Sequence, residues 1–266
     1  DGVDFRLVVE PQELDEYAAR YDRKYIDVLP FSNLGLGGIP ARNWVWEDSK
    51  KKGHERHWIL DDNIRSVMRR YRAERFVCNS AAAFRVVEDL ADRYENVAIA
   101  GMNYKMFAPD RIQKKPFTIN CHVYSNLLIL NSLPYRWRGR YNEDTDLCLQ
   151  VLSGGWCTVQ VAAFLIDKMA TMVMKGGNSA ELYKGDGRLK MARSLERAWP
   201  YVVSVDRKYQ RPQHSVRHEW KYFDTPLKRK EGLVVDSQVN NYGLELKEIG
   251  KVKSSSLRAF LDDEKP

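Results

Sequence analysis

Long apolar runs are missing from this chain of 266 residues. A helix that crosses a membrane needs about 20 consecutive apolar residues, and every apolar stretch here is much shorter, so we expect no membrane span. The N-terminal residues also lack the basic and then apolar pattern of a secretion signal. The sequence therefore predicts an intracellular protein.

Cysteine is scarce, and its spacing does not suggest a zinc site. No two of the four cysteines form a CxxC pair, and each lies in an apolar or strand-like context: Cys78, Cys121, Cys148 and Cys157. Buried, reduced thiols are the expected state of such cysteines inside a cell.

Acidic residues are outnumbered by basic ones, 36 to 43, which leaves a formal net charge of +7. An excess of lysine and arginine favours a polyanionic partner such as nucleic acid, although many ordinary enzymes have a similar balance. Hydrophobic residues make up 44% of the chain, which is enough for a packed core and argues against global disorder.

Segments with strand-like and helix-like patterns alternate along the chain. This rhythm is typical of an α/β protein in which helices flank a mixed, mostly parallel central sheet. Residues 64–77 fit either a helix or an arginine-rich strand and turn. We expect strands at 5–9, 25–29, 57–60, 97–100, 117–123, 127–130 and 158–164, and helices at 11–21, 42–52, 80–94, 144–153 and 187–199.

No internal repeat is visible, and the length suits one large domain with a short appendage. We expect residues 1–224 to form that domain. Residues 225–266 are more polar and would form a C-terminal extension, either a hairpin and a short helix or a partly mobile tail.

Two acidic side chains and an amide follow a short apolar strand in the segment 58–63, WILDDN. Open α/β sheets bind ligands at the carboxyl ends of their strands, and the oxygen atoms of Asp61, Asp62 and Asn63 suit Mg²⁺ or Mn²⁺. Such an ion can stabilise a diphosphate as a leaving group. A turn or helix cap explains the same residues without a ligand, and both explanations stay open.

Three acids within four residues open a predicted helix in the segment 140–147, RYNEDTDL. A carboxylate at this position could act as a general base that takes a proton from an acceptor hydroxyl. Acids in the first turn of a helix also stabilise its dipole, so a purely structural role remains open.

Two weaker signals lie further along the chain. Lys175 precedes the glycines Gly176 and Gly177, and a lysine on such a turn can reach a phosphate, though a surface turn explains it as well. His214 could supply a nitrogen ligand to a metal ion, while most single histidines are structural or lie at the surface.

The order of these segments resembles the GT-A glycosyltransferases, and more narrowly the TET/JBP-associated glycosyltransferases, which include the base J glucosyltransferase of kinetoplastids and related phage proteins. The resemblance is carried by residues 57–63 (HWILDDN), 137–147 (WRGRYNEDTDL) and 175–178 (KGGN). It covers residues 5–223, and the second string is its most specific part.

The resemblance implies a metal-dependent enzyme that moves a hexose, expected to be glucose, from a UDP-sugar to 5-hydroxymethylcytosine or 5-hydroxymethyluracil in DNA, with inversion at the anomeric carbon. The alternative is a UDP-sugar transferase for a protein or glycan hydroxyl, because the catalytic segments say little about the acceptor. The enzyme would work in a bacterial host cytoplasm if it is phage-encoded and in the nucleus if it is eukaryotic.

By the same resemblance, Asp144 would be the catalytic base, with Glu143 beside it. Asp62, Asn63 and His214 would hold Mn²⁺ or Mg²⁺. The acceptor or the sugar would contact Trp137, Arg138 and Asp146, with core packing as the alternative for Trp137.

The UDP-sugar would contact Glu10, Arg42, Asn43, Asp61, Lys175, Gly176 and Gly177. DNA phosphates would contact some of Arg65, Arg69, Arg70, Arg72, Lys114, Lys115, Arg136, Arg138, Arg140, Arg207, Lys208 and Arg211, although scattered basic residues on a solvated face are the alternative for each of them.

Overall fold

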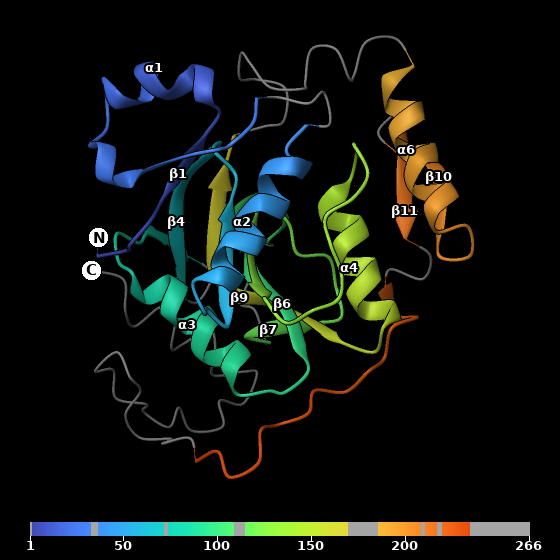
Figure 1. The fold of residues 1–266 in the computed structure, drawn as a ribbon. Coiled ribbons are helices and arrows are strands. Elements are labelled where there is room, and N and C mark those ends of the chain that lie inside the picture. Colours follow the sequence, from blue (N-terminus) through green and yellow to red (C-terminus); the bar gives the residue numbers. More distant parts are fainter. Residues whose placement is uncertain are drawn as a thin grey trace. The chain divides into compact units, whose positions relative to one another are not determined.

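Strands and helices alternate in the computed structural model (Figure 1), which describes residues 2–32, 37–71, 74–108, 115–169, 186–208, 211–216 and 220–234. The helices are α1 (Leu14–Ala18), α2 (Ile39–Lys51), α3 (Ala82–Asp92), α4 (Glu143–Ser153), α6 (Gly187–Ala198) and the 3-10 turns η1 (Pro11–Glu13), η2 (Arg23–Tyr25) and η3 (Lys105–Phe107). The strands are β1 (Leu7–Val9), β2 (Ile26–Val28), β3 (Arg56–Leu60), β4 (Ile64–Tyr71), β5 (Glu74–Val77), β6 (Val97–Tyr104), β7 (Phe117–Ile119), β8 (Asn126–Leu130), β9 (Cys157–Lys168), β10 (Val203–Lys208) and β11 (Arg211–Val216).

Seven of these described strands form one sheet in the order β3-β8-β6-β9-β4-β5, with β7 paired to β9. The α/β class and the mixed central sheet are confirmed, and the arrangement is compatible with a GT-A-like fold. The sheet differs from the expectation of mostly parallel strands, because β6–β9 is its one parallel pair among the described strands. The reason is that β8 lies between β3 and β6 and runs antiparallel to both, and that β4 and β7 run antiparallel to β9.

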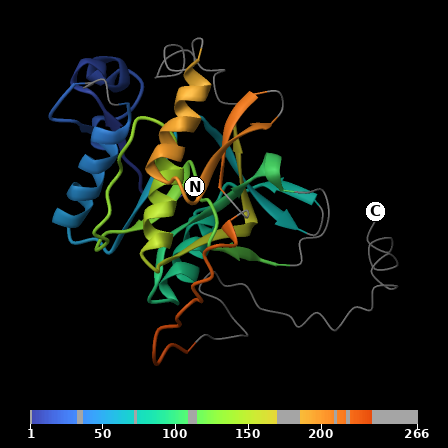
Figure 2. The same cartoon turned by 90° about the vertical axis from the view of Figure 1, so that its right-hand side faces the viewer.

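Helices cover both faces of the sheet (Figures 1 and 2). On β8, Leu127 and Ile129 pack with the core that includes α2 and α4, whereas Leu128 packs with the core that includes α3. Successive side chains of a strand point to opposite faces, so an apolar run such as β8 is buried from both sides. The predicted strand 127–130 therefore lies between the two cores and contributes to both.

The sequence left the secondary structure of one segment open and predicted that of another wrongly. Residues 64–77 form the β4–β5 hairpin, in which Arg70 lies opposite Arg75. The strand expected at 117–123 already ends at Ile119. Asn120 and Ser125 have left-handed backbones, with φ of 53° and 62°, and because such angles are not those of a strand, residues 120–125 leave the sheet.

The chain divides into two units, residues 1–230 and residues 231–266, whereas the sequence suggested a division after residue 224. Backbone contacts attach the last residues of the first unit to the start of β6. Glu95 N–H donates to the Lys228 carbonyl at 2.8 Å, and Lys230 N–H donates to the Arg93 carbonyl at 3.0 Å. Asn96 Nδ2 donates to the Pro226 carbonyl at 2.9 Å. Most of the expected extension lies outside the described residues.

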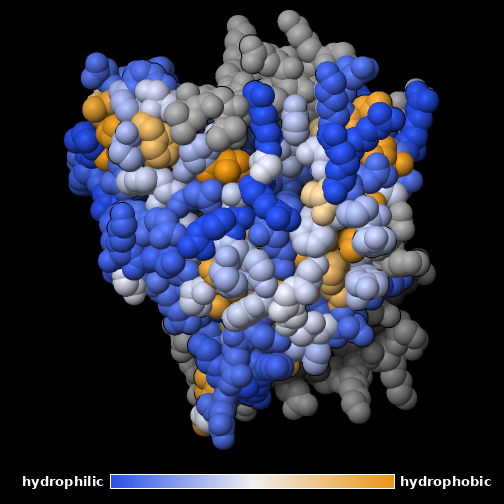
Figure 3. Space-filling view, turned by 45° about the vertical axis from the view of Figure 1, so that its right-hand side comes forward, coloured by the Kyte–Doolittle hydropathy of each residue, from blue (hydrophilic) through white to orange (hydrophobic). Residues whose placement is uncertain are grey.

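The surface in Figure 3 is mainly hydrophilic, and its hydrophobic residues gather in small separate groups. Exposed apolar residues of this kind are ordinary when they are scattered. Within the described ranges, none of the helices has the length and the apolar character that a membrane crossing requires.

Gly101 should be indispensable for the approach of β6 to β8. A Cβ atom added to Gly101 would lie 2.2 Å from the Asn126 carbonyl oxygen and 2.6 Å from Val123 Cγ1. Overpacking of this kind costs about 1–3 kcal/mol, so we expect Gly101→Ala to lower the free energy of unfolding by about that amount, measured by urea denaturation. Gly38→Ala is the control, because its Cβ would meet Arg42 Nε at an ordinary 3.6 Å; equal losses in both variants would contradict the prediction.

Candidate active site

The two acidic segments meet at one guanidinium group. Arg42, in the first turn of α2, donates from Nη2 to Asp61 Oδ1 and from Nη1 to Glu143 Oε1, each at 2.9 Å. Asp61 directly follows β3, and Glu143 opens α4. The three side chains keep only 18–28% of their surface exposed. The fold thus brings Asp61 and Glu143 to one shared, mostly buried cation.

The first turn of α2 is attached to the segment around Trp137. Asn43 Nδ2 donates to the Trp137 carbonyl at 2.9 Å, and Asn43 Oδ1 accepts from the Trp137 N–H at 3.1 Å. The Arg42 guanidinium lies 4.7 Å from the centre of the Trp137 ring, which is a cation–π contact. Trp137 is 2% exposed, so the core-packing alternative describes its position. Contacts of Asn43 with UDP and of Trp137 with an acceptor stay predictions.

Asp61 has a second cation at its other oxygen. Lys168, the last residue of β9, donates from Nζ to Asp61 Oδ2 at 2.8 Å and to Ser125 Oγ at 2.5 Å. Ser125 donates to the same Asp61 oxygen at 2.5 Å and accepts from the Tyr104 hydroxyl. We call Arg42, Asp61, Glu143 and Lys168 the charge cluster. Sequence reasoning missed Lys168 and Ser125, because their approach to Asp61 depends on how the strands pair and not on a local pattern.

Asp62 and Asn63 form the turn that follows Asp61. Asp62 is exposed, whereas the side-chain oxygen of Asn63 is buried and has no hydrogen-bond partner in the described part of the structure. Mg²⁺ is commonly bound by one or two carboxylates together with substrate phosphates and water, so these two side chains fit such an ion. No cluster of three or more His, Cys, Asp or Glu side chains suited to a metal occurs within the described ranges.

Asp144, in the first turn of α4, lies beside His122. His122 Nε2 is 3.5 Å from Asp144 Oδ1 and 3.1 Å from the Thr145 hydroxyl. Burial, the largest single influence, raises the pKa of Asp144, but His122, Arg42 and the Thr145 N–H together lower it below its ordinary value. Asp144 is therefore ionised at neutral pH, and because 24% of its side chain is exposed, a ligand can reach it.

The neighbouring carboxyl group is shifted in the opposite direction. Burial raises the pKa of Glu143, the negative charge of Asp144 raises it further, and Arg42 only partly offsets these effects. Two adjacent carboxyl groups whose pKa values are pushed apart are typical of sites that perform acid–base chemistry.

Asp146, the third acid of α4, supports other side chains from a buried position. Its two oxygens accept from Arg138 Nε at 2.9 Å and Nη2 at 3.1 Å, from Trp199 Nε1 at 2.7 Å and from Gln150 Nε2 at 2.7 Å. Asp146 is 4% exposed, whereas 55% of the Arg138 side chain is exposed. Asp146 thus positions Arg138, and a direct contact of either residue with an acceptor stays a prediction.

The remaining predicted site residues are Glu10, His214 and the segment 175–177. Glu10 follows β1 and forms a capping box with Glu13. His214 lies on β11, opposite Val205 of β10, in a hairpin that packs with α6. Its role as a metal ligand stays a prediction. Lys175, Gly176 and Gly177 lie outside the described residues.

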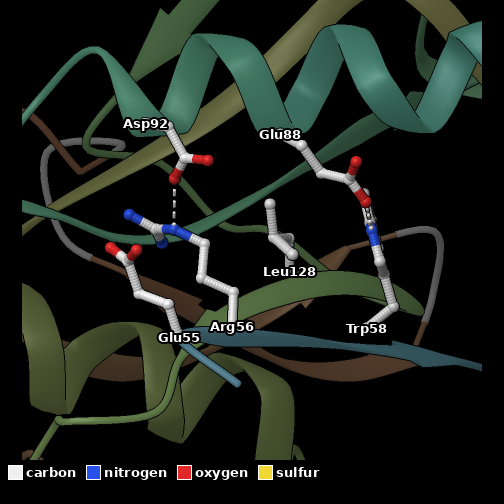
Figure 4. A pocket seen from close by; sticks show the side chains of 6 residues that line it. All are labelled: Glu55, Arg56, Trp58, Glu88, Asp92 and Leu128. Atoms are coloured by element: carbon white, nitrogen blue, oxygen red, sulfur yellow. Dashed lines mark hydrogen bonds and ion pairs between the residues drawn. The ribbon is translucent and has the colours of Figure 1, made fainter. Parts of the chain in front are cut away.

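A pocket opens between β3 and α3 (Figure 4), and no residue of the charge cluster lines it. In it, Arg56 Nε donates to Asp92 Oδ1 at 2.8 Å and Trp58 Nε1 donates to Glu88 Oε1 at 2.7 Å. The dashed lines in Figure 4 mark these two hydrogen bonds, so the four polar side chains are paired with one another. The lining, which Glu55 and Leu128 complete, includes none of the predicted site residues.

Comparison with known proteins links the chain to one family. The family model described as TET-Associated Glycosyltransferase matches residues 1–177, which is more than half of the 266 residues. The matched part contains the whole charge cluster, Asp144 and the segment 61–63, whereas His214 lies beyond it. No curated protein and no solved structure matched the chain.

Removal of the shared cation should destabilise the protein in a pH-dependent way. Arg42→Met removes the cation that binds the mostly buried Glu143 and one of the two cations that bind Asp61, so we expect a loss of about 2–4 kcal/mol in the free energy of unfolding at pH 7. Without Arg42, the raised pKa of Glu143 rises further in the folded protein. Between the pKa of Glu143 in the unfolded chain and its higher pKa in the folded variant, the folded state binds more protons than the unfolded chain. The stability of the variant therefore falls as the pH rises through that range.

The measurement is urea denaturation of wild type and variant at pH 5 and pH 7. The difference between them should be larger at pH 7, and Arg42→Lys, which keeps the charge, should show a smaller loss. A difference of the same size at both pH values would contradict the role assigned to the Glu143 ion pair.

Proposed function

The chain belongs to the TET-associated glycosyltransferase family, and from this we propose that it transfers glucose from UDP-glucose to the hydroxymethyl group of a hydroxymethylpyrimidine in DNA. Family membership makes the chain a glycosyltransferase. The observation that carries the proposal is the contact of both Asp61 and Glu143 with Arg42. It joins the segment suited to the donor and the segment suited to the acceptor in one site.

The donor diphosphate would lie at the charge cluster. Arg42 and Lys168 place two cations around Asp61, and cations of this kind bind phosphate oxygens well. Asp62 and Asn63 would hold Mn²⁺ or Mg²⁺, which supplies positive charge opposite the departing diphosphate. The buried and unpaired side-chain oxygen of Asn63 supports this assignment.

Asp144 would accept the proton of the acceptor hydroxyl. The acceptor oxygen forms a bond to the anomeric carbon while the bond from that carbon to the diphosphate oxygen breaks, and its electron pair leaves with UDP. Attack from the side opposite the diphosphate inverts the anomeric carbon. The lowered pKa of Asp144 keeps it ionised, so proton transfer accompanies bond formation, when the hydroxyl becomes acidic.

Exposed basic residues support a nucleic acid as the acceptor, because phosphate neutralisation dominates such binding. Arg70 is excluded from this role, since it is 8% exposed. Arg72, Lys114 and the side chain of Lys208 lie outside the described residues, and Arg136 is bound to Glu47. The candidates that are exposed are Arg65, Arg69, Lys115, Arg138, Arg140, Arg207 and Arg211.

The direct test incubates the protein with UDP-glucose, Mn²⁺ and DNA that contains 5-hydroxymethylcytosine or 5-hydroxymethyluracil. Mass spectrometry of the digested nucleosides should show an added hexose, and EDTA present during the reaction should prevent its transfer. DNA with unmodified cytosine and thymine is the control. Absence of any added hexose with every common UDP-sugar would refute the DNA acceptor, and hexose on a protein or glycan instead would favour the alternative acceptor class.

Asp144→Asn should abolish transfer while the donor still binds. The amide cannot take the proton, and general acid–base catalysis typically contributes about 10²–10⁴-fold in rate, so we expect turnover to fall by about that factor. UDP binding, measured by calorimetry, should change little. Asp48→Asn is the control, because Asp48 pairs with Lys52 on α2. Full turnover in Asp144→Asn would show that another group is the base.

A further inference from the structure

A continuous row of aromatic rings borders the candidate site. Tyr104 stacks with Phe107, with ring centres 5.9 Å apart and planes 11° apart, and it meets Tyr124 edge-on at 4.1 Å. Tyr124 contacts His122 at 4.4 Å, and His122 stacks with Trp220 at 5.7 Å. We call these five residues the aromatic row. They come from the end of β6 with η3, from the segment 120–125, and from a residue late in the chain.

The inner part of the row touches both halves of the proposed chemistry. The Tyr104 hydroxyl donates to Ser125, which binds Asp61, so this ring is joined to the charge cluster. His122 lies 3.5 Å from Asp144, the proposed base. Tyr124 contacts the same His122 ring at 4.4 Å. Burial raises the pKa of the Tyr124 hydroxyl, so this hydroxyl stays protonated.

The outer end of the row is open to solvent. Phe107 is 60% exposed, and its neighbour Met106 is 73% exposed. One face of Phe107 rests on Tyr104. An apolar ring left this exposed loses the stabilisation of burial, which is worth about 1.5–3 kcal/mol for a phenylalanine. A flat apolar ligand that covers the open surface of Phe107 would recover it.

The surroundings of Phe107 favour a nucleobase over other flat groups. Arg75, on β5, donates to the Ala108 carbonyl at 2.7 Å, so the β4–β5 hairpin lies directly beside η3. Arg75 is only half-buried, so it leaves a cation directly beside η3. Arg69 and Phe76 pair on the other face of the hairpin, because neighbouring residues of a strand point to opposite faces. Cations that meet phosphates, together with rings on which bases stack, are the combination that single-stranded nucleic acids bind.

We propose that the aromatic row seats the acceptor base. The unstacked hydroxymethylpyrimidine would stack on Phe107 and meet Tyr124, whose ring plane is 73° from that of Phe107, edge-on, with its hydroxymethyl group directed toward Asp144. This inference rests on the proposed function, which supplies the acceptor. A base must leave the stack of a duplex to be held in this way, or must come from a single strand. Phe107 is then a residue that determines specificity for a planar acceptor.

The test compares two labelled single-stranded oligonucleotides by fluorescence anisotropy, without any donor. One carries a single 5-hydroxymethylcytosine, and the other carries a tetrahydrofuran abasic residue at the same position. Base–aromatic stacking is worth about 1–3 kcal/mol per base. We therefore expect wild type to bind the first oligonucleotide about tenfold more tightly and Phe107→Ala to lose that preference.

Two variants separate stacking from general damage. Phe107→Trp keeps a flat ring and should keep the preference. Tyr201→Ala removes a ring that is 89% exposed in the link between α6 and β10, and it should behave like wild type. An unchanged preference in Phe107→Ala, or an equal loss of affinity for both oligonucleotides, would overturn the proposal.

Kinetics distinguish this proposal from the proposed function. If wild type glucosylates the oligonucleotide, the KM of Phe107→Ala for the oligonucleotide should rise about tenfold relative to its KM for UDP-glucose. A rise in the KM for UDP-glucose alone would assign Phe107 to the donor and overturn the proposal. Absence of sugar transfer by wild type refutes the proposed function, whereas the binding comparison still decides whether Phe107 recognises a base.

Discussion

The placement of one arginine between two carboxylates is the constraint on which the site depends. A guanidinium group is costly to remove from water unless its charge and its donors are matched. Asp61 and Glu143 match Arg42 from two segments that are distant in the chain. The start of α2, the end of β3 and the start of α4 must therefore converge whenever this charge is balanced. The same convergence places Asp144 and the turn at Asp62 within one site.

The charges of the site are largely balanced within the protein itself. Asp61 lies between Arg42 and Lys168, and Ser125 adds a hydrogen bond to the same carboxylate. Such a network holds its members in place but can exchange partners when an anion of higher charge arrives. In the proposed reaction, a diphosphate would compete with Asp61 for the two cations, so donor binding and the local ion pairs would be linked.

The sequence predicted where helices and strands occur along the chain better than it predicted which of them lie next to one another in the fold. The acids at 61–62 and 143–146 could be found because each follows a local signal, the end of an apolar strand or the first turn of a helix. Lys168 and His122 could not, because their positions depend on which strands pair and on left-handed backbone at the ends of the segment 120–125. The direction of the sheet strands was misjudged for the same reason, since local patterns do not reveal that β8 enters between β3 and β6.

The helices, strands and segments that follow residue 177 belong to the first unit of the chain. The family model ends at residue 177, yet Leu195, Val203 and Phe223 belong to the same apolar core as the central strand β8. The segment 226–230 is also hydrogen-bonded to residues 93–96, just before β6. A fragment cut at the end of the matched part would leave that core partly uncovered, so the family model is shorter than the unit that shares the core, which extends to Lys230.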